Sequence, residues 1–317
     1  MDWQPNATIE RIRARAALLG KLRQFFALRD TLEVETPLLC SGGITDPAIE
    51  PLIVERGVSL SQPHYLQTSP EFAMKRLLAA QGEPIYQISK AFRDGEAGAH
   101  HNPEFTLMEW YRPGFGHHQL MAEVADLVRH CLGERPLHKR SYRQLFLDVL
   151  QIDPFTAAAD ELQDTARLHL DTGTLSGDRD LWLDLLMSHL IEPQLVDLGM
   201  CFVYDYPASQ AALSQIASVD GVAVGLRFEL YVDGMELANG YCELTDPAEQ
   251  RMRFERDNLR RREYGLSERP VDERLLAAME YGLPGCSGVA LGVDRLLMLV
   301  TGASDIRDVL TFDWQRS

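Results

Sequence analysis

The chain has 317 residues, of which 45% are hydrophobic and 25% charged, so it can build a sizeable globular core and is not a disordered chain. Its formal net charge of −16 argues against a protein that holds nucleic acid mainly by neutralising phosphates, although a local basic patch is compatible with that charge. The five cysteines are widely spaced and lack a C-x-x-C motif, so we expect no disulfide framework or structural zinc, and a reducing cytoplasmic location. No leader pattern or 18-residue apolar run occurs, so no membrane association is expected.

The first part of the chain alternates helical and extended patterns. Apolar residues recur at every third or fourth position over residues 8–29, which predicts an amphipathic helix. Alternating apolar and polar residues predict short strands over residues 32–37 and 64–68. A helix is expected to follow and to run to residue 80. Its start is indicated by a cap residue, then a proline at the first helical position, then an acid in the first turn. These three residues are Ser69, Pro70 and Glu71.

Two long alternating segments, residues 84–93 and 104–112, predict a β-hairpin. Its connection, residues 94–103, is polar and unusually long, and long ordered loops often bind a ligand. Residues 117–215 are mostly helical in pattern and carry no chemical motif. Hairpins with interspersed helices indicate an α+β fold.

A later hairpin, residues 226–243, has Asp-Gly at residues 233–234, which is typical of a two-residue turn. That turn places Glu229 opposite Ala238 and makes Glu229 and Glu236 diagonal neighbours, roughly 7 Å apart, on one face. Two carboxylates at this spacing repel unless a cation lies between them, and Mg²⁺ commonly binds one or two carboxylates plus substrate phosphates. Taken alone, the pair is better explained as a solvated strand face on which a neighbouring arginine offsets one charge.

The first hairpin carries further candidates. Arg93 ends its inbound strand and suits bidentate contacts with phosphate or carboxylate, although a surface ion pair also explains a single arginine. Glu109 and Tyr111 share a face of the outbound strand, which suits an ammonium ligand, and an ordinary strand surface is the alternative. The adjacent His100 and His101 cannot point the same way on a strand, so a two-histidine metal site is not expected.

The end of the chain has helical patterns at residues 247–263 and 271–281, then a glycine-rich segment at residues 285–295 and a final helix. The glycine-rich segment contains neither G-x-G-x-x-G nor G-x-x-x-x-G-K-[ST], so it is not a dinucleotide fingerprint or a P-loop. The sequence shows no nucleophile elbow and no paired cysteine and histidine, which argues against covalent catalysis by a protein nucleophile.

The order of these segments resembles that of the class II aminoacyl-tRNA synthetases. Two of the five matching segments, Thr-Ser-Pro-Glu and Glu-Leu-Ala-Asn-Gly-Tyr-Cys-Glu, are similar to lysyl-tRNA synthetase in particular. The resemblance spans almost the whole chain and implies an antiparallel sheet flanked by helices, a homodimer, and the use of ATP with Mg²⁺. The segments are residues 25–37 (motif 1, the dimer interface of that family), 68–71, 92–111 (motif 2), 236–243 and 288–295 (motif 3).

The resemblance also implies roles for individual residues at an ATP site. Arg93 and Arg295 would be the catalytic residues, with Arg93 on the α-phosphate and the amino-acid carboxylate. Phe105 and Arg295 would enclose the adenine ring. Glu229 and Glu236 would hold Mg²⁺. The other ATP contacts implied by the resemblance are Asp94, Glu96, Asn102, Leu237 and Gly292.

An amino-acid site is implied beside it. Glu71 would bind the amine next to the carboxylate, and Glu109, Tyr111 and Glu243 would receive the side-chain ammonium. Glu243 and Glu236 alternate to opposite faces, so placing both in one pocket requires a β-bulge, which we expect at residues 239–240. The other substrate contacts implied are Ser69, Pro70, Asn239 and Ala290.

The chain departs from lysyl-tRNA synthetase in three places. Little sequence flanks the matched segments, so residues 1–317 are predicted to form one catalytic domain without an anticodon-binding domain. Ala290 replaces a usual glycine, and its methyl group would intrude on a pocket shaped for an α-amino acid. Both features resemble the elongation factor P–(R)-β-lysine ligases, a family of stand-alone paralogues of lysyl-tRNA synthetase. Motif 2 has Arg-Asp-Gly-Glu in place of Arg-x-Glu, so Glu96 is expected to take over the adenine contact.

This resemblance implies ATP-dependent activation of (R)-β-lysine, or lysine, as an acyl-adenylate and its transfer to a lysine ε-amine of elongation factor P, with tRNA not expected as acceptor. The alternatives are a truncated lysyl-tRNA synthetase, a non-catalytic amino-acid-binding paralogue, and an amide synthetase with a small amine acceptor. The retained arginines and carboxylates argue against the second, and Tyr111 with Glu243 argues against the third. Six arginines within residues 251–262 form a local basic run, which a solvated helix explains unless it docks an acidic partner.

Overall fold

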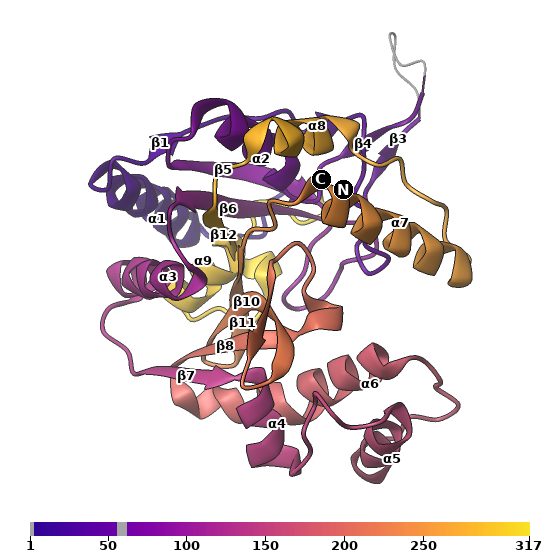
Figure 1. The fold of residues 1–317 in the computed structure, drawn as a ribbon. Coiled ribbons are helices and arrows are strands. Elements are labelled where there is room, and N and C mark those ends of the chain that lie inside the picture. The colour runs from indigo at the N-terminus through magenta and orange to yellow at the C-terminus, as the bar shows by residue number, and fades with distance from the viewer. Residues whose placement is uncertain (1–2, 56–61) are drawn as a thin grey trace.

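The computed structural model describes residues 3–55 and 62–317, whose main element is a nine-stranded sheet (Figure 1). From edge to edge its strands are β1 (Leu32–Glu33), β5 (Ile85–Phe92), β6 (Glu104–Pro113), β12 (Cys286–Gly292), β11 (Met235–Cys242), β10 (Val222–Val232), β8 (Met200–Pro207) and β7 (Leu137–Ser141). A ninth strand, β9 (Ile216–Val219), pairs with β10. A separate three-stranded sheet has the order β2 (Leu39–Cys40), β4 (His64–Leu66) and β3 (Ile53–Val54).

Three helices cover one face of the main sheet: α1 (Ile9–Ala27), α3 (His117–Leu132) and α9 (Val293–Thr301). Helix α1 begins where the side chain of Thr8 accepts the backbone N–H of Arg11. Its buried residues Leu22 and Phe26 join a core that includes Trp110 of β6 and Phe228 of β10. Each such side chain stabilises the fold by about 1.5–3 kcal/mol on burial, so this face is the main core of the molecule.

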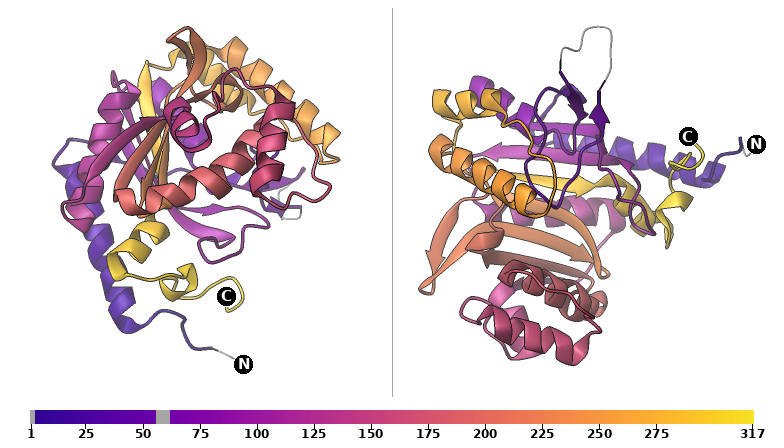
Figure 2. Two further views of the ribbon diagram at one scale, coloured as in Figure 1. Left: turned by 90° about the horizontal axis from the view of Figure 1, so that it is seen from below. Right: turned by 90° about the vertical axis from the view of Figure 1, so that its right-hand side faces the viewer.

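The opposite face is covered at its two ends only (Figures 1 and 2). At one end, α2 (Glu71–Gln81), α7 (Pro247–Glu263) and α8 (Glu273–Gly282) pack on β5, β6 and β12. At the other end, α4 (Tyr142–Leu150), α5 (Ala159–His169), α6 (Arg179–Leu186) and the turns at Met187–Ile191 and Glu192–Leu198 pack on β8 and β10. The strands between these two helical layers present polar side chains to a cavity.

The predicted helices and both hairpins are confirmed, with shifts of one to four residues at their ends. The second helix begins at Glu71, and Ser69 caps it by accepting the Glu71 N–H. The expectation that residues 117–215 are mostly helical is wrong in part, because this segment also supplies β7 and β8. The sheet is not wholly antiparallel either, since β1 pairs with β5 and β7 pairs with β8 in parallel. Among the described residues, we find no helix with the length and apolar character needed to span a membrane.

Candidate active site

The polar face between the helical layers is built from five neighbouring strands. Strand pairing aligns Gln87, Glu109, Ala290, Asn239 and Glu229 in one row across β5, β6, β12, β11 and β10. Next to this row lies a cavity of about 520 Å³ that also receives residues from the start of α2. Such a cavity, with convergent polar groups at the centre of a sheet, is the expected form of a ligand site.

A β-bulge at Leu237 decides which side chains of the late hairpin enter this cavity. Tyr231 pairs with Glu236 as expected, but Leu230 pairs with Ala238, so Leu237 is the extra residue. The expected pairing of Glu229 with Ala238 is therefore wrong: Glu229 lies opposite Asn239, and Ala238 packs into the core. The bulge needed to bring Glu236 and Glu243 into one pocket does exist, but it lies two residues before the expected position at residues 239–240.

One end of the cavity is acidic and buried. Glu109 and Glu243 are 2% and 1% exposed, and Glu71 joins them from the first turn of α2. The Nζ atom of Lys75 lies 2.6 Å from Glu71 Oε1 and 2.5 Å from Glu243 Oε2. The hydroxyl of Tyr111 donates to Glu109 Oε2 at 3.3 Å. This end can therefore bind positively charged groups.

Burial sets the protonation of these carboxyls. It raises the pKa of Glu109 to about 8, with the nearby charge of Glu71 adding to the effect. It also raises the pKa of Glu243 to about 7, against the opposing attraction of Lys75. The Oε1 atom of Glu109 is buried without a hydrogen-bond partner among the described residues. An ammonium ligand would supply that partner and favour the ionised carboxylate.

Two positions of β12 shape the space between these groups. A side chain at Gly288 would overlap Cε1 of Tyr111 and Oε1 of Glu243, so only glycine leaves the acidic end open. Ala290 lies between Glu109 and Asn239 in the row of strand pairs, and its methyl group lines the cavity. Ala290 therefore lies in the cavity lining, and its effect on the binding of an α-amino acid stays a prediction.

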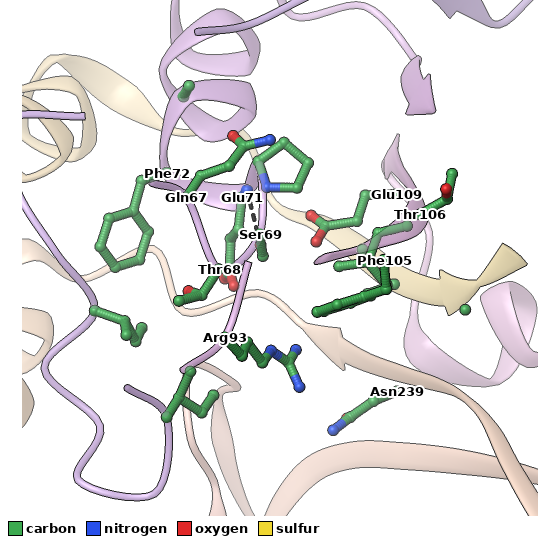
Figure 3. A pocket seen from close by; sticks show the side chains of 18 of the residues that line it. Gln67, Thr68, Ser69, Glu71, Phe72, Arg93, Phe105, Thr106, Glu109 and Asn239 are labelled. Carbon is green, nitrogen blue, oxygen red and sulfur yellow. Dashed lines mark hydrogen bonds between the residues drawn. The ribbon is translucent and has the colours of Figure 1, made fainter. Parts of the chain in front are cut away.

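The other end of the same cavity carries arginines and an aromatic ring. The Arg93 guanidinium lies 5.1 Å from the centre of the Phe105 ring (Figure 3). Arg295 donates to the backbone oxygen of Glu236 at 2.7 Å and lies 3.3 Å from its carboxylate. His101 Nε2 is 2.7 Å from Arg295 Nη2. Burial lowers the pKa of His101, and the positive charge of Arg295 lowers it further. The neutral imidazole can then accept the hydrogen bond that orients Arg295.

Most of the predicted site residues line this cavity, and the two exceptions are Asp94 and Glu229. The residues that line it are Ser69, Pro70, Glu71, Arg93, Glu96, Asn102, Phe105, Glu109, Tyr111, Glu236, Leu237, Asn239, Glu243, Ala290, Gly292 and Arg295. Asp94 does not line it, and its backbone N–H donates to the carbonyl of Glu50. The Asn102 side chain bonds the backbone of Glu104 and Trp314, so in this structure it holds the loop in shape.

Glu229 lines a neighbouring cavity of about 370 Å³ instead. It forms an ion pair with Arg227 and accepts hydrogen bonds from the hydroxyls of Tyr206 and Tyr231. Glu236 faces the first cavity, so the two carboxylates line different cavities in this structure. Within residues 3–55 and 62–317, no cluster of three or more histidine, cysteine or carboxylate groups is placed to hold a metal. Two carboxylates are still a donor set that fits Mg²⁺ when phosphates and waters complete its shell.

Sequence reasoning missed Lys75 and the contact of His101 with Arg295. The signal for Lys75 was present, because it follows Glu71 by four residues on one helix face. The basic run of α7 is a solvated helix face only in part, because two of its six arginines are buried. Arg253 and Arg261 are 8% and 0% exposed, and five of its six arginines form ion pairs. Those pairs are Arg251–Glu273, Arg253–Glu249, Arg260–Asp178, Arg261–Glu50 and Arg262–Glu268.

The family described as tRNA synthetases class II (D, K and N) matches residues 1–316, which include the sheet and the residues that line this cavity. The chain belongs to this family. Relatives similar over nearly their full length bear the name elongation factor P–(R)-β-lysine ligase. They are proteins of Pseudoalteromonas translucida (strain TAC 125), Proteus mirabilis (strain HI4320) and Salmonella typhi, at 47%, 48% and 46% identity over 99%, 100% and 99% of this chain and 98% of each relative.

Proposed function

We propose that this protein activates (R)-β-lysine with ATP and transfers it to a lysine ε-amine of elongation factor P. The observation that carries the proposal is one cavity that is lined by the buried carboxyl cluster of Glu71, Glu109 and Glu243 and also by Arg93, Arg295 and Ala290. The acidic end suits a substrate with two ammonium groups, and the arginines suit its carboxylate and the phosphates of ATP. The names of the relatives support the substrate and the acceptor.

In the first step, the substrate carboxylate attacks the α-phosphorus of ATP, forming an acyl-adenylate and releasing pyrophosphate. Arg93 and Arg295 stabilise the negative charge on the phosphates, and Phe105 provides a face for the adenine ring. The carboxylates of the acidic end fix the substrate amines, so the reacting carboxylate is held in one orientation. The protein contributes positioning and electrostatics and no covalent intermediate of its own.

Glu229 and Glu236 are the residues proposed to hold Mg²⁺, which would shield the charge of the phosphates. For this role Glu229 must turn from its ion pair with Arg227 towards the first cavity. Burial and the nearby charge of Glu229 raise the pKa of Glu236 above its usual value. A cation between the two carboxylates would offset this repulsion.

In the second step, the acceptor amine, as the free base, attacks the acyl carbonyl carbon. The bond from that carbon to the AMP oxygen breaks, an amide forms, and the amine proton leaves to solvent. We propose elongation factor P, and not tRNA, as the acceptor, and a homodimer formed through the segment at residues 25–37. Exposed apolar side chains in that segment, Leu28 and Leu32 at 74% and 55%, support an interface there.

The test is ATP–pyrophosphate exchange by the purified protein with (R)-β-lysine, with α-lysine and without an amino acid. We expect strong exchange with the β isomer, followed by a mass increase of elongation factor P that depends on ATP. A preference for α-lysine together with charging of tRNA would replace this proposal with a tRNA synthetase activity. Binding of either amino acid without exchange would replace it with a non-catalytic role.

A further inference from the structure

Lys75 is a buried cation that the proposed reaction does not use. It lies on α2, is 2% exposed, and reaches Glu71 and Glu243 at 2.6 and 2.5 Å. Burial opposes its charge, but the attraction of Glu243 and Glu71 exceeds that effect and raises the pKa of Lys75 above its usual value. Lys75 is therefore a permanent positive charge inside an acidic pocket.

The charges at this end do not balance without a ligand. Glu71, Glu109 and Glu243 carry three negative charges when ionised, and Lys75 cancels one of them. Two negative charges are left, one of them on Glu109, whose Oε1 has no hydrogen-bond partner among the described residues. A ligand with two ammonium groups neutralises the remainder, whereas a ligand with one ammonium leaves a buried carboxylate uncompensated, which is costly.

We propose that Lys75 is a positioning residue that sets the charge of the acidic end to match a doubly cationic substrate. It does so by fixing the carboxylates of Glu71 and Glu243, without touching the reacting carboxylate or ATP. The inference rests on the proposed function, since it names how the amino-acid end of that same site selects a diamino acid. Gly288 supports it, because any side chain there would displace Glu243 from its place.

The other titratable groups around this cluster are anionic or neutral. Glu109 and Tyr111 interact with it from β6, Tyr241 and Cys242 from β11, and Cys286 from β12. None of these can replace the positive charge of Lys75. Loss of that charge therefore raises the pKa of Glu243 above about 7, and the ionised form that binds ammonium is reached at higher pH.

The test compares Lys75→Met with Lys75→Arg in ATP–pyrophosphate exchange as a function of pH. For Lys75→Met we expect the KM for the diamino acid to rise roughly 10- to 100-fold, while the KM for ATP stays unchanged. The acid limb of kcat/KM should move about one pH unit or more to higher pH. Lys75→Arg keeps the charge and should leave the acid limb in place. A Lys75→Met limb that coincides with wild type would overturn the proposal.

A matched control removes another buried ion pair, Arg112–Glu123 at 2.6 Å, which lies outside the cavity. Arg112→Met should lower stability without moving the acid limb. Urea unfolding of the unliganded proteins gives a readout that needs no activity: Lys75→Met should lose stability between pH 6 and 8.5 more steeply than wild type and Lys75→Arg. If neither diamino acid supports pyrophosphate exchange by the wild-type protein, the proposed function fails. If the stability of Lys75→Met and of wild type falls with pH at the same slope in urea, the role of Lys75 is refuted separately.

Discussion

At the scale of single residues, the site is defined by charges held away from water. Arg93 and Glu109 illustrate the two ends of the cavity: a guanidinium beside an aromatic ring, and a carboxyl that burial makes hard to ionise. Arginine and glutamate are common residues, and neither by itself marks a site. Their electrostatic contacts become strong because both side chains lie in one cavity of low polarity.

Arg93→Ala should reduce amino-acid-dependent pyrophosphate exchange on the order of 100- to 1,000-fold, because one positive group at the developing phosphate charge is lost. Lys90→Ala is the matched control, since Lys90 lies on β5, three residues before Arg93, in an exposed pair with Glu104. Exchange at the wild-type rate in Arg93→Ala, with the fold retained by circular dichroism, would contradict the assignment.

Glu109 predicts a pH dependence of stability. Its pKa is raised to about 8 in the folded protein, so the folded state holds a proton that the unfolded chain releases near its ordinary pKa of 4.5. The contribution to stability is complete below pH 4.5 and is lost as pH rises through 8, about 5 kcal/mol in total. Urea unfolding of the unliganded protein should show that Glu109→Gln is less pH-dependent than wild type over this window. Parallel curves would show that Glu109 ionises normally.

At the scale of elements, β12 and β11 determine the shape of the site. The bulge at Leu237 turns Glu236 and Glu243 to one side, and Gly288 on the adjoining strand leaves the room that Tyr111 and Glu243 occupy. Both features depend on strand pairing, so a change of one residue in register would move the acidic groups to the core face.

Gly288→Ala should raise the KM for the amino acid at least about tenfold, because its methyl group overlaps Tyr111 and Glu243. Gly285→Ala is the control, because Gly285 directly precedes the same strand and an added Cβ there meets no atom within 4 Å. Steady-state exchange kinetics separate the two. A Gly288→Ala variant with an unchanged amino-acid KM would show that the acidic end does not hold the substrate.

At the scale of the whole molecule, two helical layers cover the ends of one sheet face (Figure 2). The cavity is lined by residues of β6, β11 and β12 and by the start of α2. The edge strand β1 and the end of α1 present apolar side chains at the surface, with Leu32 55% exposed. Exposed apolar groups beside an open strand edge are typical of a surface that pairs with another chain.

Leu32→Asp should convert the proposed homodimer to a monomer, because it places a charge within that interface. Leu168→Asp is the control, since Leu168 is 79% exposed on α5, at the far helical layer. Sedimentation velocity measures the outcome. A dimer in both variants would exclude this surface, and a monomeric wild type would exclude the dimer.

The sequence by itself determined the elements and the chemistry of the residues. Helical and alternating patterns predicted α1, α2 and both hairpins, because these elements depend on the residues that are adjacent in the chain. The order and spacing of the motifs predicted the family and most of the cavity lining. Only the tertiary structure decided the pairing of β8, the bulge at Leu237, the ion pair of Lys75 with Glu243, and the burial of Arg261. These depend on contacts between distant segments, and no local preference specifies which neighbour a strand or a buried charge will meet.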